Sequence, residues 1–230
     1  MMRIVFWIVA TCIVYALNKQ IYRRFNKIWL SPILVTPLLI GVAILLSGFT
    51  YDAYLVSTRP LLWMIGPATI SMAVPVYQQR AFVRTWWVVL ACGTCVATLT
   101  ALFTAAALAH CFGLPADVTH SLMARSISLP FAFAVADELK GTQDLTTLFV
   151  VMSGLFGLVC GELALAVMPV RTEQARGASM GAIAHSIGAL KALEHGPARG
   201  VMASLTMIFS GALTVLLAPF VSRLAALMMH

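Results

Sequence analysis

The sequence predicts an all-α polytopic membrane protein, with about six spanning helices and two broken or re-entrant segments that form an inverted-repeat pair. Hydrophobic residues make up 61% of the 230 positions and charged residues only 10%, whereas soluble domains carry about 25% charged residues. Long apolar stretches alternate with short basic ones, and two less apolar segments resemble each other. A chain with so little charge has no polar coat, so the lipid bilayer must be its solvent.

The spanning segments follow from length and composition. A spanning helix needs about 20 mainly apolar residues. The stretches that approach this length are 4–17, 28–49, 61–77, 86–112, 145–170 and 197–227. Tryptophans lie near several of the expected ends, as in an aromatic belt: Trp29, Trp63, Trp86 and Trp87. We expect one transmembrane domain over residues 1–230, with N-terminal helices at 1–59, a first half at 60–141 and a second half at 142–230.

Two segments, 119–141 and 176–196, do not fit the pattern of uniform spans. Both are rich in Ser, Gly and Ala, and each has a charged or titratable residue near its middle. The run Ala124-Arg125-Ser126-Ile127-Ser128 matches Ala184-His185-Ser186-Ile187-Gly188 at an offset of 60 positions. A long apolar stretch with a Ser-Gly pair follows each segment, at 153–154 and at 210–211. These similarities indicate an internal repeat.

The distribution of Lys and Arg predicts how these segments are arranged. Basic residues cluster at 19–27, at Arg80 and Arg84, and at Arg171 and Arg176, and cytoplasmic loops carry such an excess. With 19–27 in the cytoplasm, the N-terminus is outside. Arg171 then returns to the cytoplasm only if 119–141 dips into the membrane and comes back, although a kinked full crossing stays open as the alternative. The net charge of +7 thus reflects topology, and we expect no nucleic-acid partner.

Arg125 is the strongest candidate for a functional residue. A charge at bilayer depth costs at least about 2.5–3.5 kcal/mol on insertion scales, so it has a functional or pairing reason. The planar guanidinium suits a carboxylate, and Ser126 and Ser128 add hydroxyl donors on either side. The alternatives are a structural ion pair with Asp137 or Glu138, or an arginine that snorkels to the outer face.

His185 occupies the equivalent position in the second segment. It is expected to bind an anion together with Ser186 and Gly188, or to couple transport to protons, because imidazole titrates near neutrality; simple packing is the alternative. We expect Arg125 and His185 to approach each other near the midplane, since matching positions of inverted repeats meet near the pseudo-two-fold axis. A carboxylate would then sit against Arg125.

The third apolar stretch is broken as well, by Gly66-Pro67 and by Pro75. Broken helices expose backbone groups and half-helix dipoles that hold ions. Thr69 and Tyr77 therefore join the candidate substrate-binding residues, with a kink that only shapes packing as the alternative.

No enzymatic or metal-binding pattern emerges. Cys92 and Cys95 form a C-x-x-C, but they lie in an apolar run with no second ligand pair, so we expect them to pack between helices. The hydrolase, metalloprotease, P-loop and EF-hand patterns are absent from the sequence. We expect no catalytic residue, metal or cofactor.

Four stretches resemble the LrgB/CidB family of bacterial membrane proteins. They are Ile65–Thr69 with Ala73–Tyr77, Arg125–Ala132, Ala175–Gly177 with Gly181, and Ala184–Gly188 on to Glu194. The family usually has Lys at the position of Arg125 and Thr at that of Ser128, and it has Thr-Ala where this chain has Ala189-Leu190. The resemblance implies a multi-pass protein of the bacterial cytoplasmic (inner) membrane.

The resemblance implies two functions. One is transport of small monocarboxylates such as pyruvate or glycolate. The other is a holin-like role, in which the protein works with a small LrgA/CidA-type membrane partner to influence murein hydrolase activity and cell lysis. The paired broken segments with Arg125 and His185 favour transport, because a lesion-forming holin does not need them. The expected partners are a small carboxylate anion, the LrgA/CidA-type protein, the lipid bilayer and a second copy of the chain.

Overall fold

The computed structural model describes residues 2–25, 30–71 and 73–228, which are almost entirely helical. The helices are α1 (Met2–Phe25), α2 (Pro32–Ser47), α3 (Tyr51–Trp63), α4 (Ile65–Ser71), α5 (Ala73–Gln78), α6 (Arg80–Cys111), α7 (Ala116–Met123), α8 (Leu129–Leu139), α9 (Gln143–Val167), α10 (Glu173–Glu194) and α11 (Pro197–Met228). Within the described residues there is no strand. The chain divides into two compact units, one up to Ala68 and one from Thr69 onward.

The first unit packs around Trp7 of α1. Its indole is buried with Ile40 and Ile44 of α2. Phe49 and Tyr54 meet the same ring edge-on, with centroids 5.7 and 5.4 Å away. Such edge-to-face pairs add to the stabilisation that burial provides. The apolar part of α2, Leu34–Ser47, is shorter than a full span.

Three helices of the second unit are long and apolar enough to cross a membrane: α6, α9 and α11. They confirm that long apolar helices form at the stretches 86–112, 145–170 and 197–227. The stretch at 61–77 is divided among the end of α3, α4 and α5, and residues 28 and 29 of the stretch at 28–49 lie outside the described residues. A total of six spans stays a prediction.

The first broken segment is a hairpin of α7 and α8. Residues 124–128 join the two short helices, and Pro130 lies in the first turn of α8, where its missing N–H leaves no gap in the helix. At the base, Ser121 Oγ accepts a hydrogen bond from the Thr142 N–H at 2.9 Å, and Gly141 lies against Ser121. The chain therefore returns to its starting level, which favours a hairpin over a kinked crossing.

The second broken segment is folded sharply at His185, inside α10. His185 has φ +37° and ψ −120°, outside the helical region. The backbone of Gly188 lies against the Met180 carbonyl, whereas residues eight apart on a straight helix are separated by about 12 Å. The two halves of α10 thus form a second hairpin, whose tip is His185 and Ser186.

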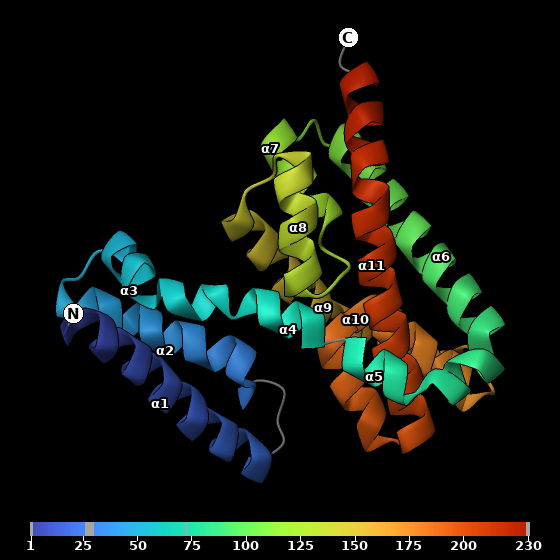
Figure 1. Ribbon diagram of the computed structural model, residues 1–230, viewed down its shortest axis with the longest axis horizontal. Coiled ribbons are helices and arrows are strands. Elements are labelled where there is room, and N and C mark those ends of the chain that lie inside the picture. Colours follow the sequence, from blue (N-terminus) through green and yellow to red (C-terminus); the bar gives the residue numbers. More distant parts are fainter. Residues whose placement is uncertain (1, 26–29, 72, 229–230) are drawn as a thin grey trace. The chain divides into compact units, whose positions relative to one another are not determined.

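Helix α11 passes along the second hairpin from base to tip (Figure 1). At the base, Gly177 meets the Arg199 carbonyl and Leu193 meets Gly200. Both ends of α10 therefore lie at the same level of α11. One turn farther along, Gly181 lies against the Ala203 carbonyl.

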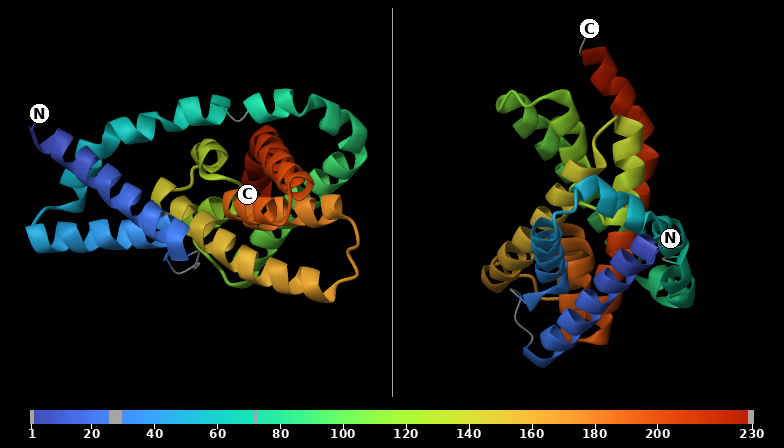
Figure 2. Two further views of the ribbon diagram at one scale, coloured as in Figure 1. Left: turned by 90° about the horizontal axis from the view of Figure 1, so that it is seen from below. Right: turned by 90° about the vertical axis from the view of Figure 1, so that its left-hand side faces the viewer.

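The same helix then reaches the first hairpin, as the views in Figure 2 also show. Met207 Sδ lies 3.6 Å from Ser186 Oγ at the tip of the second hairpin. Four residues later, the Phe131 ring from the start of α8 covers Gly211. Four residues of helix rise about 6 Å, so the two hairpin tips approach each other at the middle of α11. Ala218 then packs in the core beside α8.

Charge differs between the two ends of this unit. Leu90 of α6 packs with Ala178 and Met202, so α6 begins at the end where the second hairpin has its base. The basic residues at this end are Arg80, Arg84, Arg171, Arg176, Lys191 and Arg199. They outnumber the acidic Glu173 and Glu194 there. The base of the first hairpin instead carries four acidic residues and one basic residue: Asp117, Asp137, Glu138, Asp144 and Lys140. The positive-inside rule therefore predicts that the base of the second hairpin faces the cytoplasm.

We predict that Arg171 is cytoplasmic and Lys140 is external. Each would be replaced by cysteine in a variant without its native cysteines, and intact cells would be treated with an impermeant maleimide. Position 140 should be labelled at once, and position 171 only after permeabilisation. Labelling of position 171 from outside would contradict the hairpin arrangement.

Candidate functional site

Arg125 lies in the turn of the first hairpin and lines a cavity. Its Nη2 donates a hydrogen bond to Thr104 Oγ1 of α6 at 3.3 Å. The cavity has a volume of about 620 Å³ and lies among α6, α9 and the two hairpins. Its polar lining is Arg125, Ser126, Thr100 and Ser153, and the rest is apolar, including Phe149 and Phe156. One positive charge therefore faces a largely apolar space.

Arg125 has no carboxylate partner in the described part of the chain. The one ion pair found there joins Lys191 and Glu194. Asp137 instead accepts a hydrogen bond from Gln143 Nε2 at 3.1 Å, at the base of the hairpin and away from its tip. This geometry does not support the structural ion pair of Arg125 with Asp137 or Glu138.

His185 is buried at the tip of the second hairpin. Its imidazole lies beside the backbone of Gly154 in α9 and faces the backbone of Arg125. Its Nε2 has no hydrogen-bond partner among the described residues. The two tips therefore approach each other as expected, but His185 meets the Arg125 backbone and does not line the cavity that the guanidinium faces.

The flanking serines take different positions. Ser126 lines the cavity beside Arg125. Ser128 is the N-cap residue of α8, yet its side chain makes no capping bond, and its buried Oγ has no partner among the described residues. Ser186 Oγ points toward Met207 of α11. Gly188 is buried against Met180, where a Cβ would not fit, so it shapes the hairpin.

Two half-helices begin at the tips. α8 starts at Leu129, and the second half of α10 starts after His185. The first turns of a helix have N–H groups without intrahelical partners and carry a partial positive charge. Together with the Arg125 guanidinium, they make this region electropositive and suited to an anion.

The structure does not bring Tyr77 to this cavity. The side chain of Thr69 lies outside the described residues. Tyr77 is exposed on α5, where its ring stacks on Arg80 with the guanidinium carbon 4.8 Å from the centroid. It lines a different cavity, with Arg84 and Phe131.

Three further residues belong to this region although the sequence does not predict them as site residues: Thr104, Ser153 and Gly154. Thr104 is the hydrogen-bond partner of Arg125, but a threonine in a long apolar helix gives no signal of its own. The Ser153-Gly154 pair stands out in the sequence only as part of the internal repeat, and not as part of a site. Cys92 and Cys95 are exposed on α6, so the expectation that they pack between helices is wrong.

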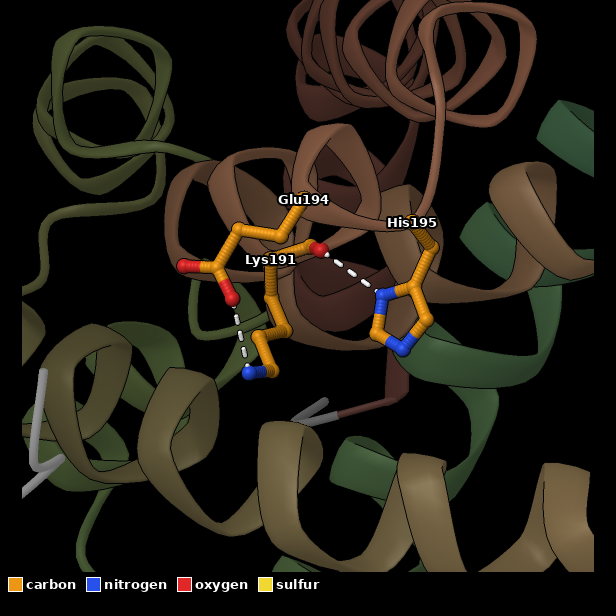
Figure 3. A network of polar contacts seen from close by, with 3 residues as sticks. All are labelled: Lys191, Glu194 and His195. Atoms are coloured by element: carbon orange, nitrogen blue, oxygen red, sulfur yellow. Dashed lines mark hydrogen bonds and ion pairs between the residues drawn. The ribbon is translucent and has the colours of Figure 1, made fainter.

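The base of the second hairpin is closed by a short polar network (Figure 3). Lys191 Nζ and Glu194 Oε2 are 2.8 Å apart, and His195 Nδ1 lies 3.1 Å from the Lys191 carbonyl oxygen. A basic residue in the last turn interacts favourably with the helix dipole. These exposed contacts end α10 and are remote from the Arg125 cavity.

Comparison with known proteins places the chain in a family. The model of the LrgB-like family matches residues 11–224. The chain belongs to the LrgB-like family. It is 31% identical to the uncharacterized protein YwbG of Bacillus subtilis over 91% of this chain and 93% of that protein. It is 26% identical to the holin-like protein CidB of Staphylococcus epidermidis, over 94% of each chain. No solved structure matches it.

The family resemblance found in the sequence is thus confirmed. The LrgB-like match covers all three long apolar helices, both hairpins and the Arg125 cavity. The match to these two relatives extends over 93% and 94% of their own length.

We predict that Gly157→Ala destabilises the protein. A Cβ at this position would lie 2.6 Å from the Ile183 carbonyl oxygen, so α9 and the second hairpin would have to separate. Such overpacking costs about 1–3 kcal/mol, which corresponds to an apparent Tm lower by roughly 2–12 °C. Thermal unfolding in detergent, followed by size-exclusion chromatography, would measure it.

Gly161→Ala is the matched control on the same helix. Its nearest neighbour would be the flexible Met180 Sδ at 3.4 Å, so its Tm should stay close to that of the native protein. Equal effects of the two substitutions would show that the close approach at Gly157 is not what matters.

Proposed function

We propose that this LrgB-like protein is a transporter subunit that moves small monocarboxylates, such as pyruvate or glycolate, through a site at the hairpin tips. The observation that carries the proposal is Arg125, a guanidinium that faces a largely apolar cavity and has no acidic partner in the described chain. An arginine at membrane depth needs a partner. A substrate carboxylate would supply one and would accept two parallel N–H donors.

The chemistry of the lining favours a monocarboxylate over a more highly charged anion. One arginine balances one negative charge. Ser126, Thr100 and Ser153 can donate to a keto or hydroxyl oxygen, and the apolar walls suit a methyl or methylene group. A di- or tricarboxylate would place a second charge against Phe149 and Phe156 without a partner, which is costly.

The hairpin arrangement supports alternating access. Transporters with inverted repeats bind substrate near the midplane, between broken helices, and expose it to each side in turn. We propose that the segments at 119–141 and 176–196 are such a pair, entering from opposite faces. The site would then lie between Arg125 and the second hairpin, with Ala182 and Ile183 on its wall.

A holin-like role is the second candidate, because the CidB relative is named as a holin-like protein. In this role the protein would act with an LrgA/CidA-type membrane partner, and a second copy of the chain could complete the assembly. Its activity would appear as lesions in the membrane and not as saturable uptake.

Uptake by proteoliposomes tests the transport proposal. Labelled pyruvate, glycolate and lactate should enter with saturable kinetics. We predict that Arg125→Ala reduces uptake by at least about 30-fold, because truncating one partner of a buried charge pair costs about 2–5 kcal/mol. Arg125→Lys should be milder, because the charge is kept, and folding and insertion should be unchanged in both variants.

The release of a trapped large dye separates the two functions. The transporter should retain the dye at substrate concentrations that saturate uptake. Dye release without saturable uptake, unchanged by Arg125→Ala, would favour the holin-like role and would contradict the proposed site.

We predict that His185→Gly preserves the fold and impairs uptake. His185 has φ +37°, a conformation that glycine adopts at little cost and that costs other residues about 1–3 kcal/mol. Both His185→Gly and His185→Ala remove a buried imidazole, but only glycine relieves the backbone, so the apparent Tm of His185→Gly should exceed that of His185→Ala. Native uptake by the stable glycine variant would exclude a role for the imidazole in binding.

A further inference from the structure

We propose that a groove between α6 and α11 binds an anionic phospholipid, with the headgroup phosphate at Arg80 and Arg84 and an acyl chain along the two helices. The groove consists of two adjoining cavities of about 600 and 380 Å³. Both are lined by Val83, Phe209 and Ala212, so they are continuous. This groove lies outside the Arg125 cavity, and the proposal does not depend on the transport function.

The two arginines form the charged end of the groove. They are one helical turn apart at the start of α6, so both project from the same face, and both line the larger cavity. Arg80 is held in place, since its Nη1 donates to the Tyr77 carbonyl at 3.3 Å and its guanidinium stacks on the Tyr77 ring. A phosphate monoanion matches this fork-like donor geometry.

Neither arginine is paired with an acidic residue in the described chain. The sequence has no Asp or Glu between Asp52 and Asp117. Two exposed cations without an ion-pair partner in the described chain therefore lie at one end of an apolar groove, which is the charge pattern that an anionic lipid complements.

The rest of the groove suits an acyl chain. In the smaller cavity, the walls are apolar except for Thr94 and Cys95, and they include Leu90, Leu213 and Leu216. Beyond Arg84, α6 is kinked at Trp86, whose φ is −111° and ψ is 19°, and Trp87 lines the cavity. Tryptophans settle at the boundary between headgroups and acyl chains. The arginines therefore lie on the headgroup side of this boundary and the leucines on the acyl-chain side, as a bound phospholipid requires.

A lipid in this groove would touch the first hairpin. Phe131 lines the same cavity as Arg80 and Arg84, and its ring covers Gly211 of α11. The bound lipid would thus support the contact that holds the first hairpin tip on α11, and its removal should loosen that contact.

Lipid binding to the purified full-length protein tests the proposal. Native mass spectrometry would measure the affinity for phosphatidylglycerol and for phosphatidylcholine with the same acyl chains. Arg80→Gln combined with Arg84→Gln should weaken phosphatidylglycerol binding roughly 30-fold and leave phosphatidylcholine unchanged. Lys140→Gln combined with Arg223→Gln removes the same charge elsewhere and should change neither affinity. Unchanged preference for phosphatidylglycerol in the first double variant would overturn the proposal.

Ala212→Trp tests the acyl end, because Ala212 lines both cavities. The substitution should weaken the binding of both lipids. An unchanged affinity for phosphatidylglycerol would place the acyl chain elsewhere and overturn the proposal. Displacement of the lipid by inorganic phosphate alone would also overturn it. In membranes, phosphatidylglycerol should slow the labelling of Ala212→Cys. If Ala212→Cys cannot be labelled and phosphatidylglycerol makes no difference to the labelling, the N-terminal helices or a second copy of the chain cover the groove. The proposal then fails.

Discussion

The close packing of α11 against both hairpins is the contact on which the rest of the second unit depends. Broken backbone is tolerated in a membrane only where protein or a cavity surrounds it. Here the carbonyls of Arg199 and Ala203 lie against Gly177 and Gly181. These glycines let the hairpin lie directly on the helix, which excludes lipid from the interrupted backbone. Without that contact, the free N–H and carbonyl groups at the tips would face hydrocarbon, at a cost of several kcal/mol each.

The long helices could be predicted from sequence because their signal is local. A run of apolar residues with almost no charge specifies α6, α9 and α11 directly. The two broken segments were also predictable, because Arg125 and His185 each interrupt an apolar pattern, and the local sequence repeats around them. The kink itself could not be located this way, since His185 has no intrinsic preference for φ +37°. Tertiary contacts with Gly154 and Met207 surround this tip.

The partners of the site residues depend on tertiary packing and could not be deduced. Nothing in the sequence around Thr104 shows that it meets Arg125. Tyr77 belongs to a motif shared with the family, but α5 carries it to the groove with Arg80 and away from Arg125. A motif thus indicates that a residue belongs to the family fold, but which cavity it faces depends on how the helices pack.

The tips differ in a way that the repeat alone does not explain. Arg125 holds its charge beside a cavity, whereas His185 is buried, with its Nε2 unpartnered in the described chain and its backbone in a costly conformation. A residue keeps a strained backbone conformation only where contacts with the surrounding structure hold it there. The second hairpin, packed on α9 and α11 through glycines, provides such surroundings. The first hairpin contacts α11 at its tip through the Phe131 side chain, and a side chain can change rotamer more easily than two backbones can separate. If the proposed transporter opens its site alternately to the two faces of the membrane, we therefore expect the first hairpin to move and the second to stay fixed.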